Sequence, residues 1–419
     1  MYRRAPITVI ETIITMRIKM TAQRISKLDY FVVFLYMAFS GNPLFIYTTE
    51  WFAVISLGIM FLLCLMGHKR LYSKRIVKLL VSFVLLSILQ CVFLNDVSLP
   101  ADVNQICKVY VAFLFASFLG LNFREAYLRV IACLSFLSLL LWAFVNVKGG
   151  LTFGIDVDRY YSLVLFDCTK GHGTYFSSFI RNSGMFWEPG AFSGFLLLVP
   201  LMYIDSLRDL YIHHKKKCLI LLAALLSTGS TTGYIVLVCL VVPLVLKNIK
   251  SVLAKYVFVV VFAGLAFYAY TELVFLGAKI TSEYEAAVDL SSGEASWSRM
   301  GAMTIDWENI QRHPLIGNGY TLESRYGALG ELMGGTGNGF TGAVNMFGIP
   351  MMLLYLIMLY RRIPVYSVQT KTLAVIAVVL LLSGEYHLNY SAYWALLFIQ
   401  YSNKKINYET KNRRIAYGV

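Results

Sequence analysis

Charged residues are scarce in this chain of 419 residues, at 14% of the sequence against 58% hydrophobic residues. Acidic residues are the scarcer kind, with 23 Asp and Glu against 37 Lys and Arg. A mean hydropathy of +0.65 lies far above that of soluble domains. This composition excludes an ordinary soluble protein and is typical of a polytopic membrane protein.

Cysteine patterning is also missing. The seven cysteines fall mostly inside apolar segments, and their spacing matches neither a zinc site nor a disulfide framework. Cys168 alone lies in a predicted outer loop, without an obvious partner. The sequence shows no metal motif, so we expect neither a metal nor a cofactor. It shows no internal repeat, and its basic, mixed beginning (1–27) lacks the pattern of a cleavable signal peptide.

The net charge of +14 would suit a nucleic-acid-binding protein, but its location argues against one. If the basic turns are placed on one side of a membrane, that side holds 28 of the 37 Lys and Arg and 6 of the 23 Asp and Glu. This asymmetry follows the positive-inside rule. We therefore expect no nucleic-acid partner, and we expect both termini on the inner side.

Apolar runs alternate with basic turns along the chain and predict an all-α integral membrane protein of about twelve transmembrane helices. We divide it into an inner segment (1–28), a transmembrane domain (29–402) and a basic inner tail (403–419). Two long outer loops, about 148–190 and 277–339, are expected to contain short amphipathic helices. Lys108 lies near the outer end of the fourth span, where snorkelling to the head groups explains its charge.

The stretch Arg181–Gly190 joins the first long outer loop to the sixth span, about Ala191 to Ile204. Pro189 suits the first turn of a helix, and a helix N-terminus near an arginine forms an anion site. An alternative is interfacial anchoring, with Phe186 and Trp187 in an aromatic belt. The pattern leaves both interpretations open.

In the second long loop, Met300, Met303, Trp307 and Ile310 recur at helical spacing. They predict an amphipathic helix over 298–312 that lies on the membrane and ends at His313-Pro314. An interfacial helix of this kind explains the apolar stripe, but it does not explain Arg299 and Arg312 in acidic surroundings.

Three motifs in this order resemble the Wzy-type O-antigen polymerases, which share a superfamily with the O-antigen ligases. They are Arg181-x-Ser-Gly-Met-Phe-x-Glu-Pro-Gly, the Ser/Thr-rich 227–232, and Arg299…Trp307…His313-Pro-Leu-Ile-Gly-Asn-Gly. The resemblance runs from the sixth to the tenth span and implies a GT-C-like membrane glycosyltransferase. The sequence departs from the ligases at one place: Gly337 replaces the histidine of their His-Asn pair before Asn338, and Gly348 follows. This departure favours a polymerase.

The resemblance implies a metal-independent transfer of a growing glycan from undecaprenyl pyrophosphate to the sugar end of another lipid-linked unit. Arginine matches phosphate oxygens in shape and charge. We therefore expect Arg181 and Arg299 to contact the pyrophosphate, with Arg312 and Arg325 as second choices.

Glu188, at a helix mouth, is the best candidate for the general base, and His313 is the next. The competing interpretations are a helix-terminal carboxylate for Glu188 and a turn hydrogen bond for His313. Tyr160 and Trp187 could stack on sugars, and Tyr320 and Asn338 complete the predicted substrate contacts.

Implied partners are undecaprenyl-pyrophosphate-linked glycans, membrane lipids, a chain-length regulator and a flippase, and the implied location is the bacterial inner membrane with both termini cytoplasmic. Two alternatives stay open within the superfamily, an O-antigen ligase and a capsular-repeat polymerase. A lipid-linked oligosaccharide flippase is the alternative of another class. Its folds usually show internal symmetry and short loops, which this chain lacks.

Overall fold

The computed structural model describes residues 25–46, 52–94, 97–148, 155–157, 160–163, 180–258, 260–261, 264, 281–286, 288, 298–327, 336–365 and 367–401. Most of the predicted inner segment (1–28), most of the predicted ninth span and the basic tail (403–419) lie outside these residues. The elements are α2 Lys27–Gly41, α3 Pro43–Ile46, α4 Phe52–Met66, α5 Lys74–Phe93, α6 Leu99–Leu119, η1 Gly120–Asn122, α7 Phe123–Lys148, β1 Ile155–Val157, β2 Tyr160–Leu163, α8 Pro189–Met202, α9 Leu207–Ser227, α10 Thr231–Asn248, α13 Arg299–Ile310, α14 Leu322–Tyr326, α16 Gly339–Arg362, α17 Val368–Gly384, η4 His387–Asn389 and α18 Ser391–Ala395.

Among the described residues, three helical stretches are long and apolar enough to cross a membrane. They are Lys74–Phe93, the continuous run Leu99–Val147 that comprises α6, η1 and α7, and Gly339–Arg362. Four shorter apolar helices, of 10–17 residues, accompany them. The prediction of a helical membrane protein is confirmed in this coarse form, and the number of twelve spans stays a prediction.

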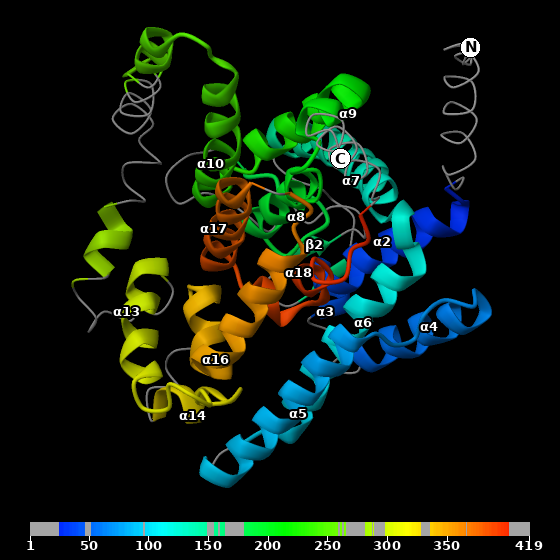
Figure 1. The fold of residues 1–419 in the computed structure, drawn as a ribbon, viewed down its shortest axis with the longest axis vertical. Helices are drawn as coiled ribbons and strands as arrows, with labels where there is room; N and C mark the ends of the chain where they lie inside the picture. Colours follow the sequence, from blue (N-terminus) through cyan, green and yellow to red (C-terminus); the bar gives the residue numbers. More distant parts are fainter. Residues whose placement is uncertain are drawn as a thin grey trace, which may run out of the picture.

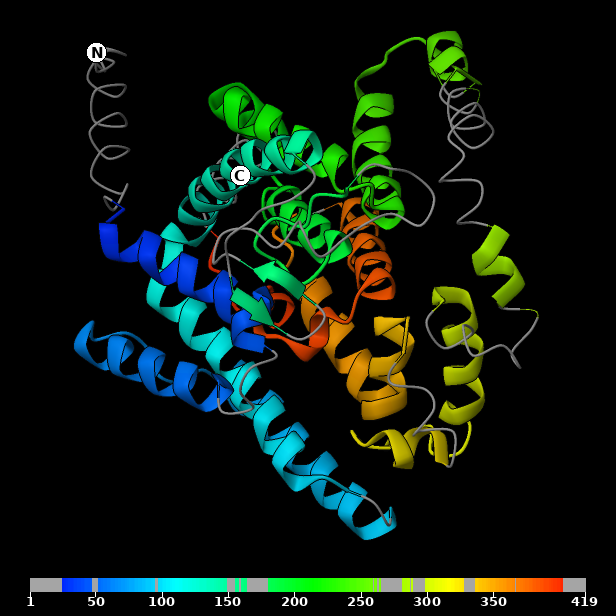
Figure 2. The ribbon, with the colours of Figure 1, turned by 180° about the vertical axis from the view of Figure 1, so that it is seen from behind.

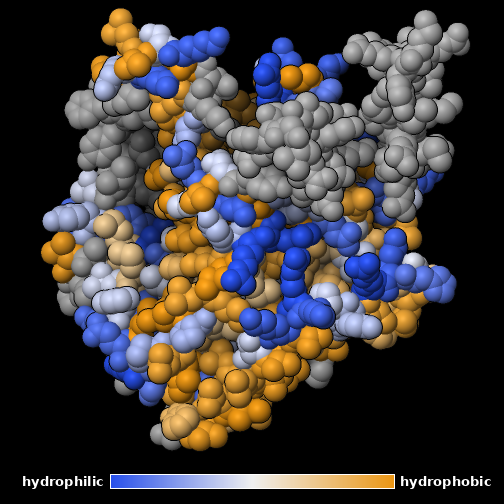
Figure 3. All heavy atoms as spheres, viewed as in Figure 1, coloured by the Kyte–Doolittle hydropathy of each residue, from blue (hydrophilic) through white to orange (hydrophobic). Residues whose placement is uncertain are grey.

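Helix α5 shows why these segments belong in lipid. Its exposed side chains form an apolar stripe at helical spacing, namely Val77, Val81, Val84, Leu85, Ile88 and Val92. Figure 3 shows apolar side chains over the lower part of the molecule, where Figure 1 places α5. Lipid tails can cover this surface, whereas a soluble protein rarely exposes so large an apolar patch.

Helix α8 lies at the centre of the bundle, and every one of its residues except Pro200 is buried. It packs against α7, α9, α10 and α17. The pair α13 and α16 forms one edge of the molecule, and α4 and α5 form another (Figures 1 and 2). A helix that is apolar on all sides is stable in such a buried position. The N-terminus of α8 is therefore surrounded by other elements of the bundle.

Two local features differ from the predicted all-α chain. The first predicted span, about Tyr30 to Thr48, is broken, because α2 ends at Gly41 and the short α3 begins at Pro43. Proline disfavours helical backbone in the residue before it, here Asn42, which is extended. In the first long loop, β1 and β2 pair as a small antiparallel hairpin (Figure 2).

The largest difference concerns the last predicted span, which is expected to follow Asn389. Within the described residues 390–401, the only helix is the five-residue α18. Residues 391–399 are all buried and run beside α6. The Ser391 hydroxyl donates to the Lys108 carbonyl, and the Phe398 ring lies 5.4 Å from that of Phe113. Irregular backbone is tolerated at membrane depth where it is buried in protein. Tyrosine hydroxyls supply the missing donors: Tyr36 bonds the carbonyl of Ala392 at 2.6 Å, and Tyr355 that of Tyr393 at 3.2 Å.

The segment predicted as an amphipathic helix, 298–312, forms α13, where the Gly301 amide donates to the Ser298 hydroxyl at 2.8 Å; its position on the membrane stays a prediction. Met300, Met303 and Trp307 are exposed on one face, as an interfacial helix requires. Ile310, the fourth member of the predicted stripe, is buried. It lies on the face that packs against α16.

Candidate functional site

The segment 181–188 is folded into the bundle. Asn182 fixes its start, donating to the Ser227 and Ser138 hydroxyls and accepting from the Gly184 amide. The Trp187 amide donates to the Gly41 carbonyl at 3.0 Å. Gly184 has a φ of +53° with the Phe192 ring against it, a position that suits glycine.

Phe186 and Trp187 are 0% and 6% exposed, so the interpretation as interfacial belt aromatics is wrong. Trp187 packs against His387 and Tyr390, at ring distances of 5.8 and 4.9 Å, and its face is not open to a sugar in this structure. The reason is the hydrogen bonding described above, which ties the loop to α2, α7 and α9.

Arg181 is held by the turn between α9 and α10. Its Nε donates to the Thr228 carbonyl at 2.8 Å, and Gly229 leaves room for the guanidinium. Burial lowers the pKa of Arg181, while the charges of Glu188 and Glu385 oppose that effect. Arginine stays protonated in proteins, so Arg181 is a half-buried cation beside these carboxylates.

Arg299 is the first residue of α13 and makes several polar contacts. Its guanidinium bonds Glu385 at 3.2 Å, the Gly384 carbonyl at 3.1 Å and Glu283 at 3.5 Å. Burial acts to lower the pKa of Arg299, but the neighbouring carboxylates outweigh it, so the pKa is raised. Glu283 also accepts the amides of Arg299 and Met300 at the N-terminus of α13.

Glu385 links the two arginines to α8. It follows α17 and is 8% exposed, and a Cβ on Gly190 would overlap its Oε1 atom. The carboxylate therefore lies against the first turn of α8. Unpaired amides give a helix N-terminus a partial positive charge, which favours an anion there.

His387 lies one turn deeper along α8, where a Cβ on Gly194 would overlap its Nε2 atom. The ring is 1% exposed and stacks on Tyr393 at 4.3 Å. Burial lowers the pKa of His387 to about 3, against the opposing charge of Glu188. A neutral imidazole at this position can accept a hydrogen bond but is a weak base at neutral pH.

Three of the predicted site residues thus come together: Arg181, Glu188 and Arg299 interact electrostatically at the mouth of α8. Glu188 is the N-cap residue of α8, and its side chain does not cap the helix. Two guanidinium groups and the carboxylates of Glu188, Glu283 and Glu385 form what we call the α8-mouth cluster. The sequence interpretation missed Glu283, Glu385 and His387, although ionisable residues between two apolar runs are a signal for a site.

The region around His313 is separate from these contacts. His313 forms the turn hydrogen bond, with its Nδ1 atom 2.8 Å from Asn318 Oδ1, and Arg312 beside it is exposed. The Asn318 side-chain amide donates to Asn345 Oδ1, and the Asn345 side-chain amide donates to the Asp306 carboxylate.

Asp306 is fully buried, and its carboxylate accepts four hydrogen bonds that join α13, α14 and α16. The donors are Tyr326 at 2.7 Å, Thr341 at 2.6 Å, Thr336 at 3.0 Å and Asn345 at 3.1 Å. A buried carboxylate with this many partners stabilises the assembly of three elements. No sequence motif predicts this network.

The other predicted substrate contacts occupy structural positions. Asn338 caps α16, with its Oδ1 atom 3.1 Å from two amides, and its amide group reaches the Arg299 carbonyl at 3.4 Å. Arg325 is buried beside the Tyr326 ring, and Tyr320 packs on Phe347. The side chain of Tyr160, in β2, lies outside the described part of the molecule.

Gly348, which follows Gly337 and Asn338 in the comparison with the ligases, lies inside α16, where a φ of +75° kinks the helix against the Leu315 carbonyl.

Within the described residues, no three His, Cys, Asp or Glu side chains are grouped to hold a metal ion. Comparison of the chain with protein-family models, with curated proteins and with solved structures finds no match. The α8-mouth cluster is therefore interpreted from its own chemistry.

Proposed function

We propose that this chain is an O-antigen polymerase, a glycosyltransferase that joins undecaprenyl-pyrophosphate-linked repeat units. The observation that carries the proposal is the convergence of Arg181 and Arg299, from two distant loops, on Glu188 and Glu385 at the N-terminus of α8. A pyrophosphate leaving group needs cations and oriented amides, and this position offers both.

In the proposed reaction, the bond between the donor sugar's anomeric carbon and the pyrophosphate oxygen breaks. A hydroxyl of the acceptor unit forms the new glycosidic bond, and Glu188 takes the hydroxyl proton. Undecaprenyl pyrophosphate leaves with the electron pair of the broken bond. Arg181 and Arg299 stabilise the charge that develops on it, and losing one such donor typically costs about 100- to 1000-fold in rate.

The carboxylates that hold Arg299 have a role in this proposal. The pyrophosphate oxygens replace Glu385 and Glu283 at the guanidinium when the donor binds. Until then the carboxylates keep a half-buried cation paired, which avoids the cost of an isolated charge. The exchange makes the arginine available only when an anion of suitable shape arrives.

The proposal places the α8-mouth cluster on the periplasmic side of the bacterial inner membrane, with about twelve spans and both termini cytoplasmic. The distribution of basic residues supports this orientation. The lipid-linked glycans reach the cluster from the bilayer. A flippase that supplies them and a chain-length regulator are the expected partners.

The test is a reconstituted assay with lipid-linked repeat units, comparing wild type with Arg181→Ala, Arg299→Ala and Glu188→Gln. We expect ladders from the wild type and their loss in all three variants. Arg129→Ala is the matched control, because Arg129 pairs with Glu125 at the exposed surface of α7 and such pairs contribute little. Thermal unfolding of each variant in detergent verifies that it is folded.

Full ladders from every variant would remove Arg181, Arg299 and Glu188 from the mechanism. A wild type that moves the lipid-linked unit across the bilayer without forming ladders would identify a transporter instead. Transfer of one finished chain to a lipid A core would identify a ligase.

A further inference from the structure

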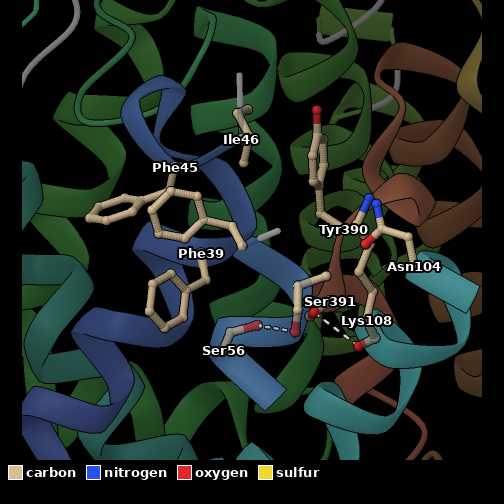
Figure 4. Close-up of a pocket in the computed structure, with 10 residues that line it drawn as sticks. Phe39, Phe45, Ile46, Ser56, Asn104, Lys108, Tyr390 and Ser391 are labelled. Atoms are coloured by element: carbon tan, nitrogen blue, oxygen red, sulfur yellow. Dashed lines mark hydrogen bonds between the residues drawn. The ribbon is translucent and has the colours of Figure 1, made fainter. Parts of the chain in front are cut away.

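The first half of α6 faces α3, α4 and residues 389–401, which we call the C-terminal segment. A cavity of about 150 Å³ lies there, whereas one buried water needs only about 15 Å³. Its lining residues are Phe39, Phe45, Ile46, Phe52, Ala53, Ser56, Asn104, Lys108, Tyr390 and Ser391 (Figure 4). We call it the Lys108 pocket.

One wall of the Lys108 pocket is polar. Lys108 and Asn104 lie one turn apart on α6, and Lys108 Nζ is 3.4 Å from Asn389 Oδ1 and 5.6 Å from the centre of the Tyr390 ring. Lys108 thus turns toward the protein, whereas snorkelling would turn it toward the head groups. It forms no ion pair among the described residues, and Asn104 Oδ1 is shielded from solvent without a hydrogen-bond partner there.

The opposite wall is aromatic. Phe39, Phe45 and Phe52 form a cluster with ring centres 5.0–6.0 Å apart, and Figure 4 shows Phe39 and Phe45 facing Tyr390 and Lys108 across the pocket. All three phenylalanines are half-exposed, so apolar surface continues from the pocket to the outside of the molecule. A ligand here meets a cation on one side and an apolar wall on the other.

We infer that the Lys108 pocket binds the phosphate-bearing head of a membrane amphiphile. An unpaired cation needs an anion, and the orphaned acceptor of Asn104 needs a donor such as a hydroxyl. Asp102, Asn104, Gln105 and Lys108 lie in the first half of α6. The run from Val109 to Ala116 is apolar except for the Tyr110 hydroxyl, which puts the pocket where head groups meet hydrocarbon. Phosphate is the common anionic group at that depth.

The ligand is either a polyprenyl phosphate or an anionic phospholipid, because both present this chemistry. Aromatic side chains connect the Lys108 pocket to the α8-mouth cluster. Tyr390 lines the pocket and contacts Trp187, the residue before Glu188. The inference does not depend on glycosyl transfer, and it is tested by binding alone.

The experiment is native mass spectrometry of the full chain in detergent, with undecaprenyl phosphate, phosphatidylglycerol, phosphatidylcholine and inorganic phosphate as separate probes. The variants are Lys108→Met, which removes the charge, and Ala53→Leu, which narrows the pocket from α4 and leaves Lys108 unchanged. Lys69→Met is the matched control, because Lys69 also lies over an aromatic ring, that of Phe118 at 5.7 Å, but outside the pocket.

We expect both pocket variants to lower the affinity for one of the two anionic lipids by about 10-fold or more, the loss expected for a hydrogen bond to a charged group. The lipid that is affected identifies the source of the phosphate. Equal retention of both anionic lipids by wild type and all variants would overturn the inference. So would binding of inorganic phosphate without retention of either lipid, or equal loss in Lys69→Met.

Discussion

At the scale of single residues, Arg299 is the most constrained cation among the described residues of the outer loops. Its guanidinium contacts two carboxylates and a carbonyl from two segments of the chain, one at Glu283 and one at Gly384 and Glu385. A planar fork with five donors can make these contacts together, whereas an ammonium group acts as a point charge. The shape of the group therefore matters beside its charge.

We predict that Arg299→Lys lowers kcat/KM for ladder formation by about 10-fold or more, even though the charge is kept. Lysine cannot reach Glu385, Glu283 and the Gly384 carbonyl together. The measurement is the initial rate with lipid-linked units, with Arg129→Lys as the control at an exposed pair. A rate equal to wild type in Arg299→Lys would show that only the charge is needed.

His387 gives a second prediction, on pH. Its pKa of about 3 in the folded protein lies below the ordinary value near 6.5, so between these values the unfolded chain binds the extra proton. The folded state is therefore penalised as the pH falls below 6.5, by about 2 kcal/mol at pH 5 from this residue alone. We expect the thermal midpoint in detergent to fall over this window, and to fall less in His387→Gln.

His213→Gln is the control for that measurement, because His213 is exposed at the surface of α9. Its pH dependence should match that of wild type. A wild-type slope in His387→Gln would mean that other groups account for the acid sensitivity.

At the scale of elements, the N-terminal half of α8 fits between side chains of the α17–α18 connection. Gly190 faces Glu385 and Gly194 faces His387, and neither position has space for a Cβ atom. The two glycines thus let a helix approach a carboxylate and an imidazole closely. The approach is what brings the α8 amides and Arg299 to the same group.

We predict that Gly190→Ala destabilises the protein by about 1–3 kcal/mol, the usual cost of overpacking, and displaces Glu385 from Arg299. The comparison is Gly58→Ala in α4, where nothing lies within 4 Å of the added Cβ and alanine should stabilise by up to about 1 kcal/mol. Thermal unfolding of both variants tests the pair. Equal stability of the two would contradict the close packing of α8.

The elements also show what the sequence could predict. Helix α13 lies where the periodicity of its apolar residues places it, because that signal is local. Glu385 and Arg299 are 86 positions apart, and no local pattern pairs them. The four hydrogen-bond donors of Asp306 are also distant in the sequence and could not be predicted from a local pattern. Arg181 and Arg299 were predictable as unusual cations in acidic loops.

At the scale of the whole molecule, the C-terminal segment connects two ends of the bundle. Its start, at Asn389, meets Lys108 in the first half of α6, and Tyr401 lies under Arg362 at the end of α16 and Arg124 near the start of α7. Only five residues of this segment are α-helical. The chain therefore runs along α6 without a full transmembrane helix of its own.

We predict that this segment nevertheless brings the C-terminus to the inner side. A fluorescent protein fused after Val419 should fold and fluoresce, and a tag there should be cleaved in inverted vesicles but protected in intact cells. A fusion at Lys255, in a predicted inner turn, is the reference. Cleavage of the C-terminal tag from the outside of spheroplasts would show that the final crossing does not occur.

The hydrogen bonds from Tyr36 and Tyr355 to this segment have a consequence for biogenesis. A membrane-insertion machine releases helices that satisfy their own amides and carbonyls, but the carbonyls of Ala392 and Tyr393 depend on donors from α2 and α16. The C-terminal segment can therefore reach its folded position only after α2 and α16 have been assembled, late in the biogenesis of the protein. Loss of either tyrosine hydroxyl should then show first as slow maturation of newly made protein, before any defect appears in the protein that has matured.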